Sequence, residues 1–399
     1  MLKVLIKKSI KLNNLGGFIL GKERIFLASP HMGGLEEVFV KEAFQSNWIA
    51  PLGPNVNAFE KEIADYVDIK SAAALVSGTA AIHMALKCIG INKGDKVFCS
   101  SLTFAASCNP IIYEKGKPVF IDSEPNSYNM STVALKKAFK RCDEEGQLPK
   151  AVIVVNLYGQ SADLYKIKEI CDFYKVPIIE DAAESLGATY QGKMSGTIGD
   201  YGIYSFNGNK IITTSGGGML VSNNEDMIEK TRFWSTQSRE NERHYEHKEL
   251  GYNYRMSNVV AGIGRGQLRV LEKRIENKKY IFESYKEAFK EIDYIDMAPI
   301  CQYGEPNYWL SIITLKEESK VKPIDIIKAL EKENIESRPI WKPMNLQPFY
   351  KDFEFFNHNE EGISVGEDIF NRGVCLPSDT KMTEEDINRV SQIIKELFL

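Results

Sequence analysis

Several residues of this 399-residue chain have types and positions that suit the binding of a phosphate and a flat ring. Segment 77–81, SGTAA, leads directly into a helical pattern, and the free N–H groups of a helix start bind phosphate. Its candidate contacts are Gly78, Thr79 and Ala80. An ordinary capped helix would have the same sequence, and segment 77–81 alone favours that simpler interpretation. Phe104 could stack on a ring, or it could equally belong to the core.

Two acids and a lysine could carry proton transfer and amine chemistry. Asp181 ends an apolar run, where burying an unpaired carboxylate would be costly, so it should be solvated, paired or functional. Glu184 follows three residues later and shares a helical face with Asp181 if a helix starts there. Lys210 lies in a polar loop further along the chain. That arrangement can bring its amine and the carboxylate to one crevice.

Short apolar runs that alternate with helical patterns must position these residues. Several runs are rich in Val and Ile without alternation, as expected of strands that are buried on both faces. This rhythm predicts an α/β fold with an open, mostly parallel sheet, in which ligands bind beyond the carboxyl ends of the strands. The candidate residues all lie just after such runs. The predicted strands are 72–76, 96–100, 118–121, 151–156, 177–180, 201–206 and 218–222.

The pattern changes after about residue 255, where 259–285 reads as one long helix followed by mixed helices and strands. We predict a large domain over 24–269 and a smaller α+β domain over 270–399. The first residues, 1–23, form a basic and mildly amphipathic extension. It is either a frayed or over-long start, which the sequence favours, or a membrane-surface helix. Its apolar stretches are broken by lysines, so it is a poor signal peptide.

Composition excludes several classes of protein. The formal net charge is -4, and no basic stripe stands out, which argues against nucleic-acid binding. The seven cysteines show no CxxC spacing, so we expect neither a zinc site nor a disulfide framework. Reduced thiols favour a cytoplasmic location. No apolar run approaches the roughly 20 residues that span a bilayer, so no membrane association is predicted.

Taken together, the candidate residues provide a phosphate cradle, an aromatic face, a carboxylate and a lysine on successive strand ends. Pyridoxal 5′-phosphate (PLP) needs all four, because it carries a phosphate, a pyridine ring and an aldehyde that forms a Schiff base with lysine. Asp181 would hold the proton of the ring nitrogen through a charge-assisted hydrogen bond. The sequence therefore predicts a PLP enzyme.

From about residue 24 onwards, the sequence resembles the fold-type-I PLP-dependent sugar aminotransferases of the DegT/StrS family. The resemblance implies a domain with a mostly parallel seven-stranded sheet, a small C-terminal domain and a homodimer with shared active sites. The motifs that carry it are SGTAAIHMAL (77–86), LTFAAS (102–107), EDAAESLGA (180–188), YSFNGNKIITTSGGGML (204–220) and GYNYRMSN (251–258).

The resemblance also implies roles for single residues. Lys210 matches the Schiff-base lysine, Asp181 the partner of the ring nitrogen, and Glu184 a position, often Gln, beside the ring's 3-oxygen. Phe104 matches the aromatic residue stacked on the ring. Asn253 matches a residue that reaches the phosphate from the neighbouring subunit. Relatives that replace the lysine by His dehydrate sugars, so a lysine here argues for transamination. The remaining matches, at the phosphate, are Thr79, Ala80 and Ser205.

Three segments, 29–36, 46–60 and 335–348, look like enzymes that aminate C4 of a UDP-linked 4-keto-6-deoxy-N-acetylhexosamine on the way to bacillosamine-type sugars. The resemblance implies L-glutamate as the amino donor. Many relatives have His where this chain has Asn345, which leaves a substrate contact in doubt. The candidate partners for the nucleotide-sugar substrate are Arg239, Arg255, Arg338, Trp341 and Lys342. Equally, Trp341 could be a domain-interface anchor and the charged side chains could be solvated.

Two alternatives remain open on the sequence. A GDP- or TDP-linked keto-sugar aminotransferase, of the perosamine synthase type, would share every cofactor residue. A PLP-binding regulator would carry a fused DNA-binding helix-turn-helix, and 1–23 is too short for one.

Overall fold

The computed structural model describes residues 23–399, and its largest element is a mixed sheet with the strand order β1-β9-β8-β5-β4-β2-β3-β13. Strand β9 runs antiparallel to both of its neighbours, and the remaining pairs are parallel. The extension expected over 1–23 lies, apart from Glu23, outside the described residues. The strands are β1 (Ser71–Leu75), β2 (Lys96–Ser100), β3 (Lys117–Ile121), β4 (Ala151–Val155), β5 (Ile178–Asp181), β8 (Tyr201–Ser205), β9 (Gly218–Ser222) and β13 (Phe355–Phe356).

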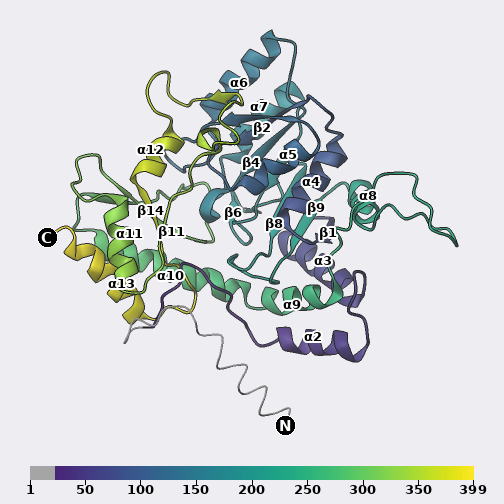
Figure 1. Ribbon diagram of the computed structural model, residues 1–399, viewed down its shortest axis with the longest axis horizontal. Helices are drawn as coiled ribbons and strands as arrows, with labels where there is room; N and C mark the ends of the chain where they lie inside the picture. Colours follow the sequence, from purple (N-terminus) through teal and green to yellow (C-terminus); the bar gives the residue numbers. More distant parts are fainter. Residues whose placement is uncertain (1–22) are drawn as a thin grey trace.

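Helices cover both faces of this sheet, as Figure 1 shows. In β4, Ala151 and Ile153 pack with α4 on one face, whereas Val152 and Val154 pack with α6 and α7 on the other. Every residue of β4 is buried, which explains its unbroken apolar sequence. The helices are α2 (Glu36–Gln45), α3 (Pro54–Val67), α4 (Gly78–Ile89), α5 (Asn109–Tyr113), α6 (Thr132–Glu144), α7 (Leu164–Tyr174), α8 (Glu225–Ser235), α9 (Asn258–Leu268), α10 (Leu271–Phe289), α11 (Pro323–Lys332), α12 (Val365–Arg372) and α13 (Glu384–Glu396).

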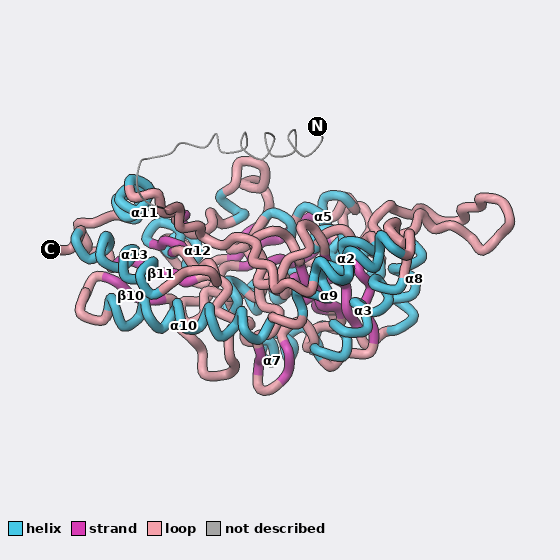
Figure 2. The backbone as a smooth tube through the Cα atoms, turned by 90° about the horizontal axis from the view of Figure 1, so that it is seen from below, coloured by secondary structure: helices cyan, strands magenta, loops and turns pink. Residues whose placement is uncertain are grey.

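A second sheet, with the order β10-β11-β14-β12, forms a smaller layer together with α11 and α13. Helix α10 leads into this part of the molecule from α9 (Figure 2). The predicted domain boundary at residue 270 falls between these two helices and stays a prediction. The strands of the second sheet are β10 (Ile295–Met297), β11 (Ser311–Leu315), β12 (Arg338–Pro339) and β14 (Gly373–Leu376), and a separate hairpin is formed by β6 (Thr189–Tyr190) and β7 (Lys193–Met194).

The prediction of one long helix over 259–285 was wrong, because α9 and α10 are separate helices. Val270 lies between them with non-helical backbone (φ −113°, ψ 3°). Its side chain packs so closely on Gly33 that a Cβ there would lie 2.9 Å from a methyl group of Val270. A Cβ on Gly266 would lie even closer, 2.5 Å from the backbone nitrogen of Glu36. The end of α9 is therefore held against α2, and the chain changes course there.

Seven strands of the large sheet correspond to the seven that were predicted, and β13 is an addition. It comes from the C-terminal part of the chain and pairs in parallel with β3 at the sheet edge. Within residues 23–399, no helix is long and apolar enough to cross a membrane.

Candidate active site

The predicted lysine and acids meet at one edge of the large sheet. Strands β5 and β8 are parallel neighbours, so Asp181 at the end of β5 and the loop after β8 lie at the same edge. Lys210 is in that loop, and its Nζ lies 3.7 Å from Oε1 of Glu184. The Lys210 side chain is only 12% exposed and the Glu184 side chain 4%. An amine and two carboxylates therefore lie together, largely buried, at this edge of the sheet.

Asp181 is held by a chain of hydroxyl groups that starts in the loop after β2. Ser107 Oγ donates to Asp181 Oδ2 at 2.7 Å and lies 2.6 Å from Thr103 Oγ1. The backbone N–H of Ala183 donates to the other carboxylate oxygen at 3.2 Å. Burial raises the pKa of Asp181, while the Ser107 hydroxyl, the Ala183 N–H and the charge of Lys210 oppose that rise. A buried acid with few partners can bind a cationic ligand group strongly.

Glu184 accepts a hydrogen bond from an unusual piece of backbone. The N–H of Tyr158 donates to Glu184 Oε2 at 2.7 Å, and Tyr158 has left-handed backbone with φ 51°. Such a conformation is unfavourable for a non-glycine residue and is often retained at functional sites. Burial raises the pKa of Glu184 to about 7, against the opposing charge of Lys210 and the Tyr158 N–H. Glu184 is therefore poised to change its charge near neutral pH.

Replacing Glu184 by Gln is expected to stabilise the cofactor-free protein above pH 7. Because the folded-state pKa is raised from 4.5 to about 7, the folded protein loses stability as the pH rises through this window. The Gln variant avoids that loss, so its advantage in unfolding free energy should grow from near zero at pH 4.5 to as much as about 3 kcal/mol at pH 8. Unfolding midpoints at several pH values measure it. A difference that does not depend on pH would contradict this explanation.

Trp309, at the start of the small sheet, reaches the catalytic edge and was not predicted from the sequence. Lys210 Nζ lies 4.2 Å from the centre of its ring, within the range of a cation–π interaction. Its indole N–H donates to the carbonyl of Asn209 at 2.8 Å, next to Lys210 in the chain. Asn307 holds the backbone of Trp309. Its Oδ1 accepts from the backbone N–H of Trp309, and its side-chain N–H donates to the backbone carbonyl of Glu184. A lone Trp before a strand gives no sequence signal for this role.

The phosphate-cradle segment has the structure of a capped helix start. Ser77 is the N-cap of α4, and its Oγ accepts from the N–H of Ala80 at 3.0 Å. Gly78 packs tightly against Ser205, since a Cβ on Gly78 would lie 3.2 Å from the Cβ of Ser205. Gly218 of β9 crosses this turn so closely that a Cβ would lie 2.3 Å from Ser77. The N-terminus of α4, with Thr79 on its first turn, therefore sits beside Ser205 at the sheet edge.

A cluster of aromatic side chains lies next to Glu184, which accepts from the backbone N–H of one of its members, Tyr158. The exposed Phe104 has its ring centre 6.0 Å from that of Trp341, which in turn lies 5.1 Å from that of Tyr158. The backbone N–H of Trp341 donates to the hydroxyl of Tyr158 at 3.1 Å. Phe104, Trp341 and Lys342 line a cavity of about 500 Å³. This cavity contains two predicted substrate contacts and the predicted ring-stacking residue.

The other predicted contacts differ in their environments. Arg338 is largely exposed and pairs with Glu336 at 2.7 Å. Asn253 and Arg239 are exposed and line another cavity. Arg255 lines the same cavity, but it is buried and its guanidinium is paired with Glu60 inside the same chain. Its predicted contact with the substrate stays a prediction.

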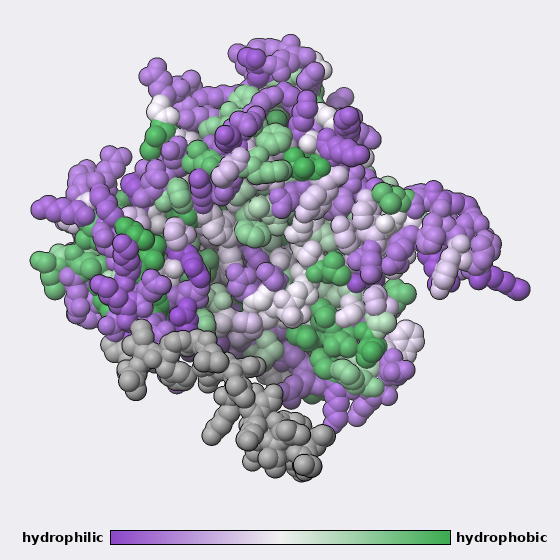
Figure 3. Space-filling view, viewed as in Figure 1, coloured by the Kyte–Doolittle hydropathy of each residue, from purple (hydrophilic) through white to green (hydrophobic). Residues whose placement is uncertain are grey.

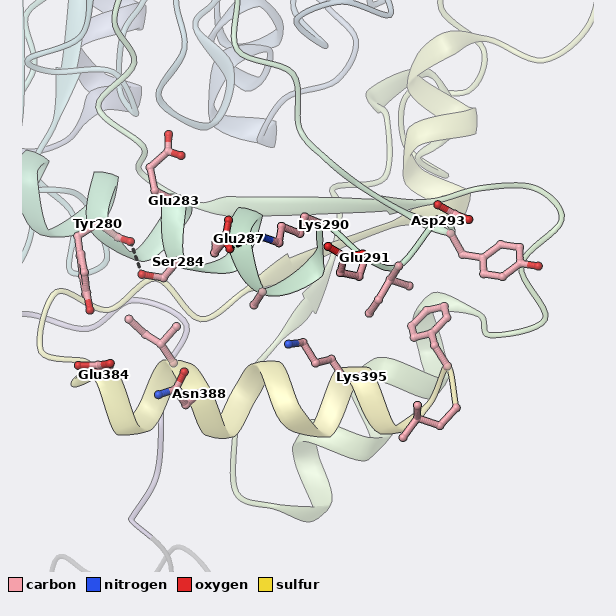
Figure 4. Close-up of a pocket in the computed structure, with 16 residues that line it drawn as sticks. Tyr280, Glu283, Ser284, Glu287, Lys290, Glu291, Asp293, Glu384, Asn388 and Lys395 are labelled. Atoms are coloured by element: carbon pink, nitrogen blue, oxygen red, sulfur yellow. Dashed lines mark hydrogen bonds and ion pairs between the residues drawn. The ribbon is translucent and has the colours of Figure 1, made fainter.

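Asn345, the residue that stands where many relatives have His, is held by the loop after β2. Its Oδ1 accepts from Ser101 Oγ at 2.5 Å. A separate groove between α10 and α13, shown in Figure 4, is lined by none of the predicted site residues. Its acidic side chains include Glu283 and Glu287.

The comparisons with known proteins agree with this geometry. The model of the DegT/DnrJ/EryC1/StrS aminotransferase family matches residues 31–395. EpsN of Bacillus subtilis, named a pyridoxal phosphate-dependent aminotransferase, is 54% identical over 94% of this chain and 96% of its own length. GDP-perosamine synthase of Caulobacter vibrioides is 34% identical over 94% and 99%. A DegT DnrJ EryC1 StrS aminotransferase from Brucella abortus has a crystal structure with a TM-score of 0.84 and 28% identity, covering 91% of this chain and 95% of its own.

The chain therefore belongs to the DegT/DnrJ/EryC1/StrS aminotransferase family and is a pyridoxal phosphate-dependent aminotransferase. The predicted fold class and cofactor are confirmed. The described residues fit PLP: Lys210 offers an amine, Asp181 a buried carboxylate at the same edge, and the start of α4 N–H groups that suit a phosphate.

Proposed function

We propose that this aminotransferase moves an amino group from L-glutamate to C4 of a UDP-linked 4-keto-6-deoxy-N-acetylhexosamine. The observation that carries the proposal is the cluster at the sheet edge, in which Lys210 lies close to two buried carboxylates and to aromatic residues. Its substrate end depends on the likeness of 29–36, 46–60 and 335–348 to enzymes acting on such sugars. In support, UDP-4-amino-4,6-dideoxy-N-acetyl-beta-L-altrosamine transaminase of Campylobacter jejuni is 32% identical to this chain.

Each residue has a proposed task around the cofactor. PLP supplies an aldehyde that takes up the amino group and a ring that withdraws electrons. With PLP bound, Lys210 would anchor the cofactor and its amine would serve to move a proton, while Asp181 would keep the ring nitrogen protonated. Glu184 would lie beside the 3-oxygen, and Phe104 would stack on the ring. The proposed phosphate contacts are Gly78, Thr79, Ala80, Ser205 and, from the neighbouring subunit, Asn253.

The decisive experiment is to incubate the protein with L-glutamate and a panel of UDP-, GDP- and TDP-linked 4-keto-6-deoxy sugars, with mass spectrometry as the readout. We expect a new amino sugar from the UDP substrate. Amination of the GDP substrate alone would favour the second candidate, a GDP-linked keto-sugar aminotransferase. The 34% identity to GDP-perosamine synthase supports this candidate. No amination of any sugar would contradict both candidates.

Replacing Arg338 by Ala should raise KM for the keto-sugar several-fold or more. The exposed guanidinium, held by Glu336, can offer a bidentate fork to a diphosphate, and a charged hydrogen bond contributes about 1.5–3 kcal/mol. The half-reaction with glutamate, followed alone by the loss of the cofactor's visible absorption, should hardly change. If that half-reaction slows while sugar binding is untouched, Arg338 serves the carboxylate of the donor instead.

We further propose that the enzyme is a homodimer and that its apolar face around α2 is the interface. Exposed apolar side chains gather there, and Figure 3 shows this part of the surface in green. Phe44 is 64% exposed, Trp48 55% and Leu52 53%. Single exposed apolar residues are normal, but a cluster of them marks an interaction surface. Leu52 and Asn253 line the same cavity, which supports a position of Asn253 beside the proposed interface. The seven free cysteines support a cytoplasmic location.

If Asn253 serves the neighbouring subunit's cofactor, two inactive variants should restore each other. Lys210→Ala chains mixed with Asn253→Ala chains should regain up to about half of the wild-type activity per mixed dimer, because one of its two sites carries both changes and the other neither. Activity after subunit exchange, with exchange verified by native mass spectrometry, measures this. Proven exchange without recovery would place Asn253 in the site of its own subunit.

A further inference from the structure

A second buried lysine lies close to the catalytic one and has no part in the proposed chemistry. Lys278, on α10, is 3% exposed. Its Nζ donates to the carbonyl of Trp309 and to the carbonyl of Ser378, each at 2.7 Å. Burying an amine this completely is costly unless its hydrogens find acceptors. The two carbonyls are therefore specific partners of the amine. Trp309 lies just before β11, and Ser378 lies just after β14.

Those two carbonyls belong to residues that shape the catalytic edge. Trp309 places its indole 4.2 Å below the amine of Lys210 and holds the carbonyl of Asn209. Ser378 accepts from the N–H of Ser311, the first residue of β11, so it fixes the strand that follows Trp309. Lys278 and Lys210 also line one small cavity, together with Asp379 and His31.

We propose that Lys278 is a positioning residue of the active site, which fixes the indole of Trp309 under Lys210 by joining the carbonyls of Trp309 and Ser378. It acts only through Trp309 and touches neither substrate nor cofactor. Burial lowers the pKa of Lys278 to about 7, while the charge of Asp379 opposes this. A neutral amine has two hydrogens for its two carbonyl acceptors, so the low pKa agrees with this geometry.

The inference rests on the proposed attachment of PLP to Lys210, and it predicts an effect on that amine. An aromatic face stabilises the cationic form of a nearby nitrogen. When Lys278 is replaced by Met, Trp309 loses one of its anchors and its ring moves from under Lys210. The cationic form of the attachment nitrogen should then be less stable, and its pKa should fall.

The test uses the PLP-loaded full chain and follows the visible absorption of the cofactor against pH. Lys278→Met should lower the titration midpoint by about half a pH unit or more and change the tryptophan emission of the cofactor-free protein. The matched control is Lys96→Met, which removes another buried lysine. Lys96 is the first residue of β2, at the opposite end of the strands from the active site, and its amine pairs with Glu354 at 3.0 Å.

Equal losses of unfolding midpoint in Lys278→Met and Lys96→Met, with titration and emission unchanged in both, would overturn the inference and make Lys278 purely structural. If the Met variant does not fold, Lys278→Gln serves instead, because its shorter amide reaches one carbonyl and should give a smaller downward shift. An unchanged midpoint in that variant would equally overturn the inference. A wild-type protein without any titrating visible band would instead contradict the attachment of PLP to Lys210.

Discussion

Lys210→Ala is expected to leave a folded protein that has lost turnover by about 10³-fold or more, because one side chain supplies both the attachment point and the moving proton. The fold should survive. The amine of Lys210 is 3.7 Å from Glu184 and lies over the ring of Trp309, and both residues keep other hydrogen bonds, from the N–H of Tyr158 and to the carbonyl of Asn209, when that amine is removed. Steady-state rates and unfolding midpoints of the two proteins measure the two parts of this expectation.

Borohydride reduction separates the attachment from the proton transfer. In the wild-type protein it should bleach the visible absorption and leave a modified peptide that contains Lys210. The variant should bind PLP only reversibly and yield no such peptide. Lys193→Ala, in the exposed hairpin strand β7, is the matched control and should behave as wild type. A modified peptide at another lysine would show that the attachment residue has been misassigned.

Asp181→Asn should lower turnover by roughly 10²- to 10⁴-fold, the range expected for a group that holds a proton in the transition state. The amide cannot supply the negative charge that keeps the ring nitrogen protonated. The surrounding hydrogen bonds can adapt, since the amide N–H₂ can donate to Ser107, whose hydroxyl then turns to donate to Thr103. The loss should therefore be one of charge and not of structure.

Ser107→Ala tests this distinction. It removes the hydroxyl that donates to Asp181 and leaves the carboxylate in place, so turnover should fall far less than in Asp181→Asn. PLP binding and unfolding midpoints of both variants complete the comparison. If Asp181→Asn lost its fold, or if the two variants were equally impaired, the special role of the Asp181 charge would be refuted.

The strands were predictable because their cause is local. Strand β2 and strand β9 have the same bounds as the predicted runs 96–100 and 218–222, since apolar runs bounded by turn residues form strands wherever both faces are covered. The break at Val270 and the two-residue strand β13 have causes far away in the chain. One depends on packing against Gly33 and the other on pairing with β3, and neither leaves a periodic pattern.

The same distinction holds for the site. The positions of Asp181 and Lys210 were predictable because one ends a strand and the other follows the next strand in the sheet, and the carboxyl ends of parallel strands meet at one edge. Ser107 comes from a short turn, and Tyr158 owes its role to a left-handed backbone, not to its side chain type. Trp309 comes from the segment just before β11 of the other sheet. Such contributions follow from tertiary arrangement, which one sequence does not display.

Strand β13 has a consequence for how the enzyme can exclude water during its reaction. The N–H of Phe120 donates to the carbonyl of Glu354 at 2.8 Å, and the N–H of Asp122 to that of Phe356 at 3.0 Å. These bonds tie the C-terminal part of the chain to the large sheet, and the indole of Trp309 adds a further tie at Asn209. A wide rigid-body hinge between the two parts would have to break them. We therefore expect any closure over the substrate to come from short loops, such as the one that carries Trp341, while the two sheets stay in fixed register.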